Sequence, residues 1–366
     1  MSTFSDKLKY YNAFNLFQEI GVVRFRKLLN YFSDLEIAWQ AGAGELQQAG
    51  LDRKLAEKIC AERKNINPDE EFEKLAKEKI EIIIPENKSY PKILKEIHDP
   101  PMVLYVRGEF KPEDDFSLAV VGTRRPTSYG MQVATDLTHK LSCAGLTIVS
   151  GLARGIDTIA HKTVLQAGGR TIAVVGSGID KQNIYPPSNR QLAEIIAQKG
   201  TVISEYPFGT QAMPYHFPAR NRIISGLSLG TLIIEAAEKS GTFLTANHAL
   251  EQNRQVFAVP GPIYSPNSVG PNSLIKIGAK LVNKIEDILE ELNLTSAVQY
   301  QEARQILPDS QEEKLILEIV SSEPIHIDKI IAATKLDTAT ASSTLALMEM
   351  KGKIKNLGGM NYIIAR

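Results

Sequence analysis

The chain has 366 residues, 43% of them hydrophobic, which allows two or three domains with buried cores. Its 42 basic residues balance its 42 acidic ones, so we do not expect a broad basic surface of the kind that binds duplex DNA nonspecifically. The two cysteines, Cys60 and Cys143, lack metal-ligand spacing, which excludes a zinc ribbon or a disulfide framework. Because no run approaches the ~18 apolar residues of a membrane span, we expect a cytoplasmic protein without membrane contact.

Residues 1–67 predict a small helical domain. Apolar residues recur at helical spacing from Phe14 to Ile20 and resume after Gly21, and a further helix is expected from residue 49. Helices joined by a glycine turn resemble helix-hairpin-helix and SAM-like domains, and the former bind DNA phosphates through that turn. Since the usual second glycine is missing after Gly21, we favour a packing or partner-binding role and keep phosphate binding as the alternative.

Residues 68–115 predict a linker followed by a helix and a small β-rich segment that leads into the next domain. From residue 116 to residue 292, short apolar runs alternate with helical stretches. The expected strands are 119–121, 147–149, 171–175, 202–204, 232–234 and 256–259. This alternation indicates an α/β fold with an extended Rossmann-like parallel sheet covered on both faces. Ligands of such sheets bind beyond the carboxyl ends of the strands, where the strand order reverses.

The C-terminal part predicts a second type of domain. Residues 293–308 are polar and are expected to form a linker. Within residues 309–366, three helical stretches precede a hairpin that turns at Gly358-Gly359. Three helices and a β-hairpin indicate a winged helix.

The first loop of the sheet, Gly122-Thr123-Arg124, has the position of a dinucleotide-binding fingerprint. Only one glycine of that fingerprint is present, and Arg124 occupies the position of the glycine that lets the backbone approach a pyrophosphate. An arginine fork binds phosphate oxygens with its side chain instead. We therefore expect a phosphate site and no nicotinamide cofactor, or any other cofactor or metal.

Two further segments predict phosphate binding. Arg220, Asn221 and Arg222 follow an aromatic-proline turn, and Lys239-Ser240-Gly241-Thr242 forms a small-residue turn that opens a helix. Free N–H groups and the positive end of a helix dipole favour an anion at such a turn. The alternative for the paired arginines is a pair of surface ion bridges.

The loop Ser150-Gly151 follows the second strand, and its glycine would let the backbone approach an anion. The segment continues to Asp157 and His161, but a catalytic triad is not expected because Ser150 lacks the nucleophile-elbow sequence. We predict that Asp157 caps a helix and that His161 packs in the core.

Aromatic side chains accompany the arginines. Tyr206, Phe208, Tyr215 and Phe217 lie near Arg220 in the sequence. Aromatic rings stack on bases while cations neutralise the backbone, which is how proteins bind single-stranded nucleic acid. We expect one or two of these rings to be accessible and the others to pack in the core.

Several ordered motifs resemble the family of DNA-processing protein A, also called Smf, over nearly the whole chain. The motifs are Val121–Arg124, Ser150–Asp157 with Ala160-His161, Thr171–Gly178, Ser204–Pro207, Phe217–Ser228, Ser240–Thr242 through Ala246, and Val259–Gly261. The resemblance implies an extended Rossmann domain that binds single-stranded DNA, forms a homodimer and loads RecA recombinase during natural transformation or homologous recombination.

The resemblance also implies roles for individual residues. Arg124 would bind phosphate on one side of the site, Arg220, Asn221 and Arg222 would form the other side, and Ser240, Gly241 and Thr242 would form its base. The chain departs from the family at Thr123, where Ser is common, and at Pro187, where many members carry a DNA-contacting lysine. Arg190 or Lys181 could replace that lysine.

The main alternative is a nucleotide hydrolase of the lysine-decarboxylase-like phosphoribohydrolase type. Those enzymes need glutamates after their Gly-Thr helix start, whereas Phe243 and Leu244 follow Thr242 here. Glu205 and Glu235 are the remaining carboxylates near strand ends. We therefore expect no catalytic residue and no enzyme activity. A protein-interaction module is a third possibility, which the neutral charge favours and the arginines do not.

The end of the Rossmann segment predicts an assembly surface. Residues 274–282 carry apolar side chains on more than one face, whereas packing on a single sheet requires only one. We expect Ile275 and Leu281 to lie in a two-fold dimer interface.

Overall fold

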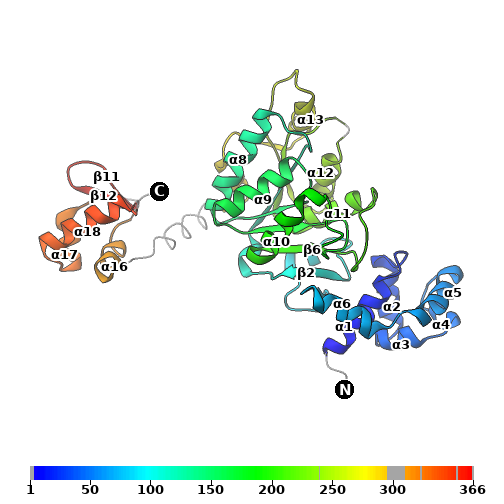
Figure 1. Ribbon diagram of the computed structural model, residues 1–366. Coiled ribbons are helices and arrows are strands. Elements are labelled where there is room, and N and C mark those ends of the chain that lie inside the picture. Colours follow the sequence, from blue (N-terminus) through cyan, green and yellow to red (C-terminus); the bar gives the residue numbers. More distant parts are fainter. Residues whose placement is uncertain (1–3, 239, 295–309, 322–323, 352, 365–366) are drawn as a thin grey trace. The chain divides into compact units, whose positions relative to one another are not determined.

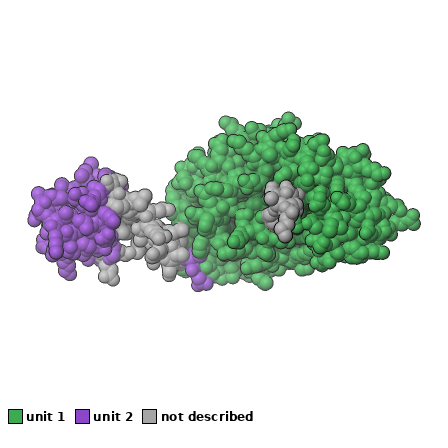
Figure 2. Space-filling view, turned by 90° about the horizontal axis from the view of Figure 1, so that it is seen from below, with its two compact units in different colours: residues 1–292 green, residues 293–366 purple. Residues whose placement is uncertain are grey.

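The computed structural model describes residues 4–238, 240–294, 310–321, 324–351 and 353–364. The chain divides into two compact units, Met1–Leu292 and Asn293–Arg366 (Figures 1 and 2). Across the described ranges, no helix combines the length and apolar character needed to cross a membrane.

The first unit begins with six helices that lie at one edge of a sheet (Figure 1). They are α1 (Phe4–Asn15), α2 (Val22–Tyr31), α3 (Leu35–Gln40), α4 (Ala43–Gln48), α5 (Arg53–Glu62) and α6 (Pro68–Lys77). The expectation that the first helix reaches Ile20 is wrong, because α1 ends at Asn15 and a turn follows. The helix expected from residue 49 begins at Arg53, since Asp52 accepts the Leu55 N–H as its N-cap.

The sheet of the first unit has nine strands in the order β1-β2-β6-β5-β4-β3-β7-β8-β9. The strands are β1 (Glu81–Ile83), β2 (Leu104–Gly108), β3 (Ser117–Gly122), β4 (Thr147–Ser150), β5 (Thr171–Val174), β6 (Thr201–Ser204), β7 (Gly230–Ile234), β8 (Gln255–Ala258) and β9 (Lys280–Leu281). From β6 to β9 all neighbours are parallel, which confirms the predicted Rossmann-like sheet. The strands of the β-rich lead-in, β1 and β2, extend the same sheet as antiparallel neighbours.

Helices connect the strands and cover the sheet. They are α7 (Lys92–Lys95), α8 (Ser128–Cys143), α9 (Ile156–Gln166), α10 (Arg190–Lys199), α11 (His216–Gly226), α12 (Thr242–Glu251), α13 (Val269–Lys276) and α14 (Glu286–Glu291). Strand β3 pairs with β4 on one side and with β7 on the other, so the strand order reverses at β3. Ligands of such sheets bind at the carboxyl ends around this reversal.

The N-terminal helices share a hydrophobic core with the sheet. Phe14 and Trp39 belong to the same buried cluster as Tyr105 and Val175. The buried Tyr105 hydroxyl donates to Asn12 Oδ1 at 2.8 Å and accepts from Asn15 Nδ2 at 3.2 Å, which joins β2 to α1. These contacts make the helices part of the body that carries the sheet.

The second unit contains the predicted winged helix. Its elements are α16 (Gln311–Leu317), β10 (Ile325–His326), α17 (Ile327–Thr334), α18 (Thr338–Met350), β11 (Ile354–Asn356) and β12 (Asn361–Ile364). Its core includes Ile316, Ile330 and Leu345, which come from the three helices. Asp337 caps α18 by accepting the N–H groups of Ala339 and Thr340.

Replacing Tyr105 by phenylalanine should destabilise the first unit by about 1–3 kcal/mol, because Asn12 and Asn15 would lose a buried hydrogen-bond partner. Urea unfolding followed by the fluorescence of Trp39, the single tryptophan of the chain, measures this loss. Tyr31→Phe is the control, since its hydroxyl bonds Gln48 in an exposed position and should change the free energy of unfolding by under about 0.5 kcal/mol. Equal effects of the two substitutions would contradict the role of Tyr105.

Candidate nucleic-acid interface

A pocket of about 310 Å³ lies at the carboxyl edge of the sheet, beside the reversal of strand order. Its lining residues are Arg124, Arg125, Gly151, Ala153, Arg154, Tyr185, Pro186, Phe217 and Arg220. We call it the arginine pocket, because four of these side chains are guanidinium groups. Arg124, Arg125 and Arg154 are exposed, whereas Arg220 is buried.

Arg220 lies at the base of the pocket with only 4% of its surface exposed. Its Nη1 donates to the carbonyl oxygen of Gly151 at 2.6 Å and also to that of Val174, while its buried Nε has no hydrogen-bond partner among the described residues. Burial lowers the pKa of Arg220 to about 10, and the charge of Asp157 opposes that shift. The guanidinium therefore remains protonated at neutral pH and supplies a fixed positive charge beneath the pocket.

Gly151 is required for this arrangement. A Cβ atom at Gly151 would lie 2.7 Å from Asp157 Oδ2 and would also overlap Arg220 Nη1. The Asp157 carboxylate accepts the N–H groups of Gly151 at 3.0 Å and Ala153 at 3.3 Å. Burial raises the pKa of Asp157, and Arg220 acts in the opposite direction. Because it has no side chain, Gly151 leaves room for the buried Arg220 guanidinium and the buried Asp157 carboxylate, which both bond its backbone.

The expectation that Asp157 is a helix N-cap is wrong. The N-cap of α9 is Gly155, and Asp157 lies within the first turn, from which its carboxylate reaches back to the preceding loop. Gly155 has a φ of 80°, and a Cβ atom there would overlap the carbonyl oxygen of Thr123. Glycine is required at this position for both reasons.

Gly122 and Thr123 hold the backbone next to Arg124 and do not line the arginine pocket. A Cβ atom at Gly122 would overlap the carbonyl oxygen of Ile234, so glycine permits β3 and β7 to pack at this point. The Thr123 N–H donates to the carbonyl oxygen of Glu235 at 2.7 Å, and its hydroxyl accepts the Arg125 N–H at 3.2 Å. The two residues therefore position the arginines.

The chain's own carboxylate occupies the N-terminus of α8. Glu235 is buried and accepts the Thr127 N–H at 2.8 Å and the Thr127 hydroxyl. In dinucleotide-binding folds this helix start holds the pyrophosphate. A pyrophosphate here would meet the negative charge of Glu235, which agrees with the incomplete glycine fingerprint.

Ser150 and Arg190 do not reach the arginine pocket, contrary to expectation. Ser150 is fully buried, and its hydroxyl donates to the carbonyl oxygen of Val120 at 2.6 Å. Arg190 donates to the carbonyl oxygens of Ile184 and Gln182, so it holds a nearby loop. Both side chains are therefore held by backbone carbonyl oxygens outside the arginine pocket.

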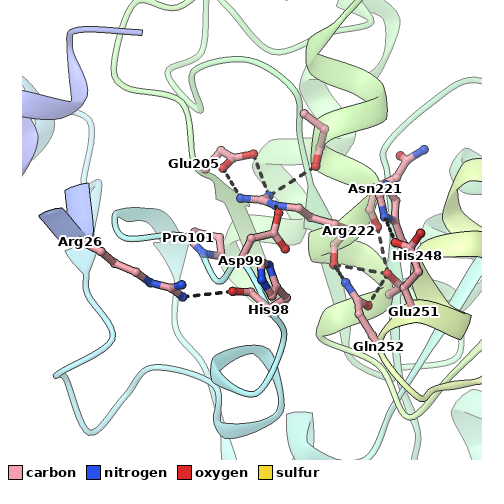
Figure 3. A network of polar contacts seen from close by, with 12 residues as sticks. Arg26, His98, Asp99, Pro101, Glu205, Asn221, Arg222, His248, Glu251 and Gln252 are labelled. Atoms are coloured by element: carbon pink, nitrogen blue, oxygen red, sulfur yellow. Dashed lines mark hydrogen bonds and ion pairs between the residues drawn. The ribbon is translucent and has the colours of Figure 1, made fainter. Parts of the chain in front are cut away.

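Arg222 lies on a different side of α11 from Arg220, and the expectation that both form one side of the site is corrected here. Its guanidinium bonds Asp99 and Glu205, each at 2.8 Å (Figure 3). Burial alone would lower the pKa of Arg222, but these two carboxylates raise it. Residues two apart in a helix do not face the same side, which is why the pair separates.

Asn221 and the Ser240–Thr242 turn form a second small cluster outside the arginine pocket. Asn221 Nδ2 lies 3.4 Å from the carbonyl oxygen of Gly241, the N-cap residue of α12. The Ser240 hydroxyl accepts the Thr242 N–H at 3.2 Å and contacts the Thr242 hydroxyl at 2.9 Å. The N–H of Thr242, one of the N–H groups at the start of α12, is therefore already hydrogen-bonded within the protein. Lys239, also predicted for this site, lies outside the described residues.

Two aromatic rings belong to the arginine pocket. The Arg124 guanidinium lies 5.5 Å from the centre of the Phe217 ring, and Phe217 and Tyr185 have ring centres 5.6 Å apart. Tyr206 instead stacks on His216 with ring centres 4.0 Å apart. Tyr215 is 60% exposed next to that pair. The prediction that one or two of the rings are accessible and the others pack in the core is only partly correct, since Tyr215 is exposed but Tyr206, Phe208 and Phe217 are half-buried.

Sequence reasoning did not include Arg125, Arg154 and Tyr185 among the site residues. Arg125 directly follows Arg124, and Arg154 lies inside the Ser150–Asp157 motif, so both were visible in the sequence. What was missing is the direction of each side chain, which depends on how the loops fold over the sheet.

His161 is a core residue, as predicted. It is fully buried, and its Nδ1 lies 2.7 Å from the Thr171 hydroxyl. Burial, with a smaller contribution from Arg220, lowers its pKa from 6.5 to about 3. In the part of the chain that the structure describes, no group of three or more metal-ligating side chains comes together.

The fold and the pocket define a class: a Rossmann-like protein with a guanidinium-rich pocket and an additional winged helix. Residues 81–293 match the family described as DNA recombination-mediator protein A, and residues 301–360 match the DprA winged helix domain. The chain therefore belongs to the DNA recombination-mediator protein A family.

Individual relatives agree with this assignment. Protein Smf of Synechocystis is 35% identical over 96% of this chain and 98% of its own length, and DNA processing protein DprA of Bacillus subtilis is 48% identical over 56% and 69%. The crystal structure of DprA from Streptococcus pneumoniae has a TM-score of 0.65 at 34% identity, covering 79% of this chain and 98% of that one. A DprA structure from Helicobacter pylori, described for its single-stranded DNA binding mode, has a TM-score of 0.53 at 33% identity, covering 58% and 95%.

The low pKa of His161 predicts a pH dependence of stability. Below pH 6.5 the unfolded chain binds a proton at this histidine that the folded chain excludes down to about pH 3. As the pH is lowered from 6.5 towards 3, the free energy of unfolding should therefore decrease, by up to about 1.4 kcal/mol per pH unit from this group. His161→Asn should show a shallower pH dependence than the parent, and His139→Asn, at an exposed histidine, should not. An unchanged slope in His161→Asn would refute the prediction.

Proposed function

We propose that the protein binds single-stranded DNA through the arginine pocket. The observation that carries the proposal is the cluster of three exposed arginines over the buried Arg220, next to Phe217 and Tyr185. Arg124, Arg125 and Arg154 neutralise backbone phosphates, and the rings stack on bases. The related DprA structure described for single-stranded DNA binding supports the same ligand.

The pocket favours single strands over duplex. Bases within a duplex are stacked on one another and are unavailable to Phe217 and Tyr185, whereas a single strand can present them. The charge distribution supports this preference. Residues 111–307 contain 18 basic and 16 acidic residues, so their net positive charge is too small to neutralise the many phosphates of a long duplex. The positive charge is concentrated in the pocket.

Family membership supports a proposal for the cellular role. The protein protects incoming single-stranded DNA in the cytoplasm and loads RecA recombinase onto it during natural transformation or homologous recombination. Membership in a family of recombination mediators supports this role, as do relatives named DNA processing protein DprA. A RecA-dependent strand-annealing reaction with and without the protein tests it.

The hydrolase alternative has less support. Glu205 is bonded to Arg222, and Glu235 accepts hydrogen bonds from Thr127 at the start of α8, so both of the carboxylates considered for acid–base chemistry have partners. A nucleoside-monophosphate hydrolysis assay run beside an oligothymidylate gel shift distinguishes the two functions: binding without hydrolysis supports the DNA-binding role, and hydrolysis without binding supports the enzyme.

Arg124→Ala should weaken oligothymidylate binding and leave the order of preference among sequences unchanged, because phosphate contacts do not read bases. The slope of log affinity against log salt should become shallower by about 0.7, the single-strand value for one lost phosphate contact. Lys140→Ala, at an exposed cation on α8, is the control and should keep the parent slope. Parent-like affinity in a folded Arg124→Ala protein would remove the pocket from the binding site.

The protein forms a homodimer through the β9 edge of the sheet. Leu281 on this edge strand is 37% exposed, and Ile277, the C-cap residue of α13 four positions earlier, is 74% exposed. Ile275, which was expected in the interface, packs partly against the core of the sheet. Ile277 and Leu281 therefore supply the exposed apolar surface of the proposed interface.

Leu281→Glu should convert a dimer into a monomer at micromolar concentration, since two-fold symmetry brings two like charges into the patch. Light scattering measures the mass. Leu250→Glu on α12, at a leucine that is 54% exposed, is the matched control and should stay dimeric. A monomeric parent, or a dimeric Leu281→Glu protein, would show that the interface is not at β9.

A further inference from the structure

A second hollow lies where the N-terminal helices meet the sheet. One part has a volume of about 660 Å³ and is lined by the turn at residues 15–21, by Lys58 and Glu62 of α5, and by residues of the 205–219 segment. An adjoining part of about 460 Å³ continues along residues 207–213. The two parts share Leu16, Gln18, Pro207 and Tyr215. We call the combined hollow the helical-domain groove.

The surface of this groove is apolar and uncharged in the main. Tyr215 is 60% exposed and Met213 is 40% exposed, and the amide side chains of Gln18 and Gln211 lie among the lining residues. Flat rings, a thioether and amide groups match the faces and hydrogen-bonding edges of nucleobases.

The charged groups of the groove are largely paired. Lys58 bonds Glu19 at 2.6 Å, and Glu205 bonds Arg222 at 2.8 Å. The Lys58–Glu19 pair carries no net charge, and Glu62, which also lines the groove, would repel a phosphate. The groove therefore differs in chemistry from the arginine pocket: it suits bases and disfavours backbone phosphates.

The groove and the arginine pocket both have lining residues at the start of α11. Tyr215 lines the groove, and Phe217, two residues later, lines the pocket. Tyr215 and Phe217 directly flank His216, whose ring centre lies 4.6 Å from that of Tyr215, and two residues of chain span at most about 7 Å, so one short segment contributes a ring to each hollow. His216 between them is buried and stacks on Tyr206, which fixes this part of the chain.

We propose that the helical-domain groove binds the bases of nucleotides that flank those held in the arginine pocket, with Tyr215 as the stacking residue. The inference rests on the proposed single-stranded DNA binding and extends that site onto the N-terminal helices. It assigns the turn at residues 15–21 a direct part in DNA binding through the groove, rather than through a phosphate-binding hairpin.

The test is a double-mutant cycle between Tyr215 and single abasic positions moved along an oligothymidylate, measured with the full-length chain. Tyr215→Ala should weaken binding of the intact oligonucleotide roughly 5- to 150-fold, the range for one stacked base. The slope of the salt dependence should stay at the parent value, because no phosphate contact is lost. At one abasic position, Tyr215→Ala should cause no further loss, since the stacking partner is already absent.

Tyr215→Phe should retain the parent affinity, because the ring is kept. Tyr264→Ala is the matched control, since Tyr264 is 93% exposed and lies outside both hollows. If the parent does not bind the oligonucleotide, the proposed function itself fails. If the parent binds and Arg124→Ala weakens it, but Tyr215→Ala keeps full affinity or adds the same loss at every abasic position, the groove proposal alone is overturned.

Discussion

The buried guanidinium of Arg220 is the interaction on which the arginine pocket depends. A cation in the interior is costly unless hydrogen bonds and a nearby opposite charge compensate it. The carbonyl oxygens of Gly151 and Val174 and the carboxylate of Asp157 supply that compensation. Because these groups come from the ends of β4 and β5 and from α9, Arg220 ties α11 to two strands and holds the loop that carries Arg154. Three exposed arginines of the pocket then lie around this buried guanidinium.

Two glutamates separate this site from the nucleotide sites of similar folds. Glu235 occupies the start of α8, where a dinucleotide would place its pyrophosphate, so a phosphate at that position would meet a negative charge. Glu205 neutralises Arg222 and, through its carbonyl oxygen, accepts a bond from Asn15 of α1. Arg26 of α2 bonds the carbonyl oxygen of His98, next to Asp99, which also pairs with Arg222 (Figure 3). The same polar network that removes Arg222 from the pocket thus joins the N-terminal helices to α11.

The sequence was sufficient to predict the parallel sheet and the winged helix, because continuous apolar strands and the helix–hairpin order are local patterns. It also identified Arg124 and Arg220, which the structure brings into one pocket. It failed for Arg222, Ser150 and Arg190, since adjacency in a motif does not determine which way a side chain points. The start of the helix at Arg53 and the N-cap at Gly155 were missed because each depends on a single capping or glycine geometry. Whether Ser240 and Thr242 bind phosphate stays a prediction.

The central claim is that backbone phosphates of single-stranded DNA lie in the arginine pocket. A crystal structure of the full-length chain bound to oligothymidylate tests it most directly. The account predicts phosphate oxygens within about 2.7–3.2 Å of guanidinium nitrogens of Arg124 and of Arg125 or Arg154, with a base against Phe217 or Tyr185. Oligonucleotide bound elsewhere on the protein, with the arginine pocket free of phosphate, would contradict it.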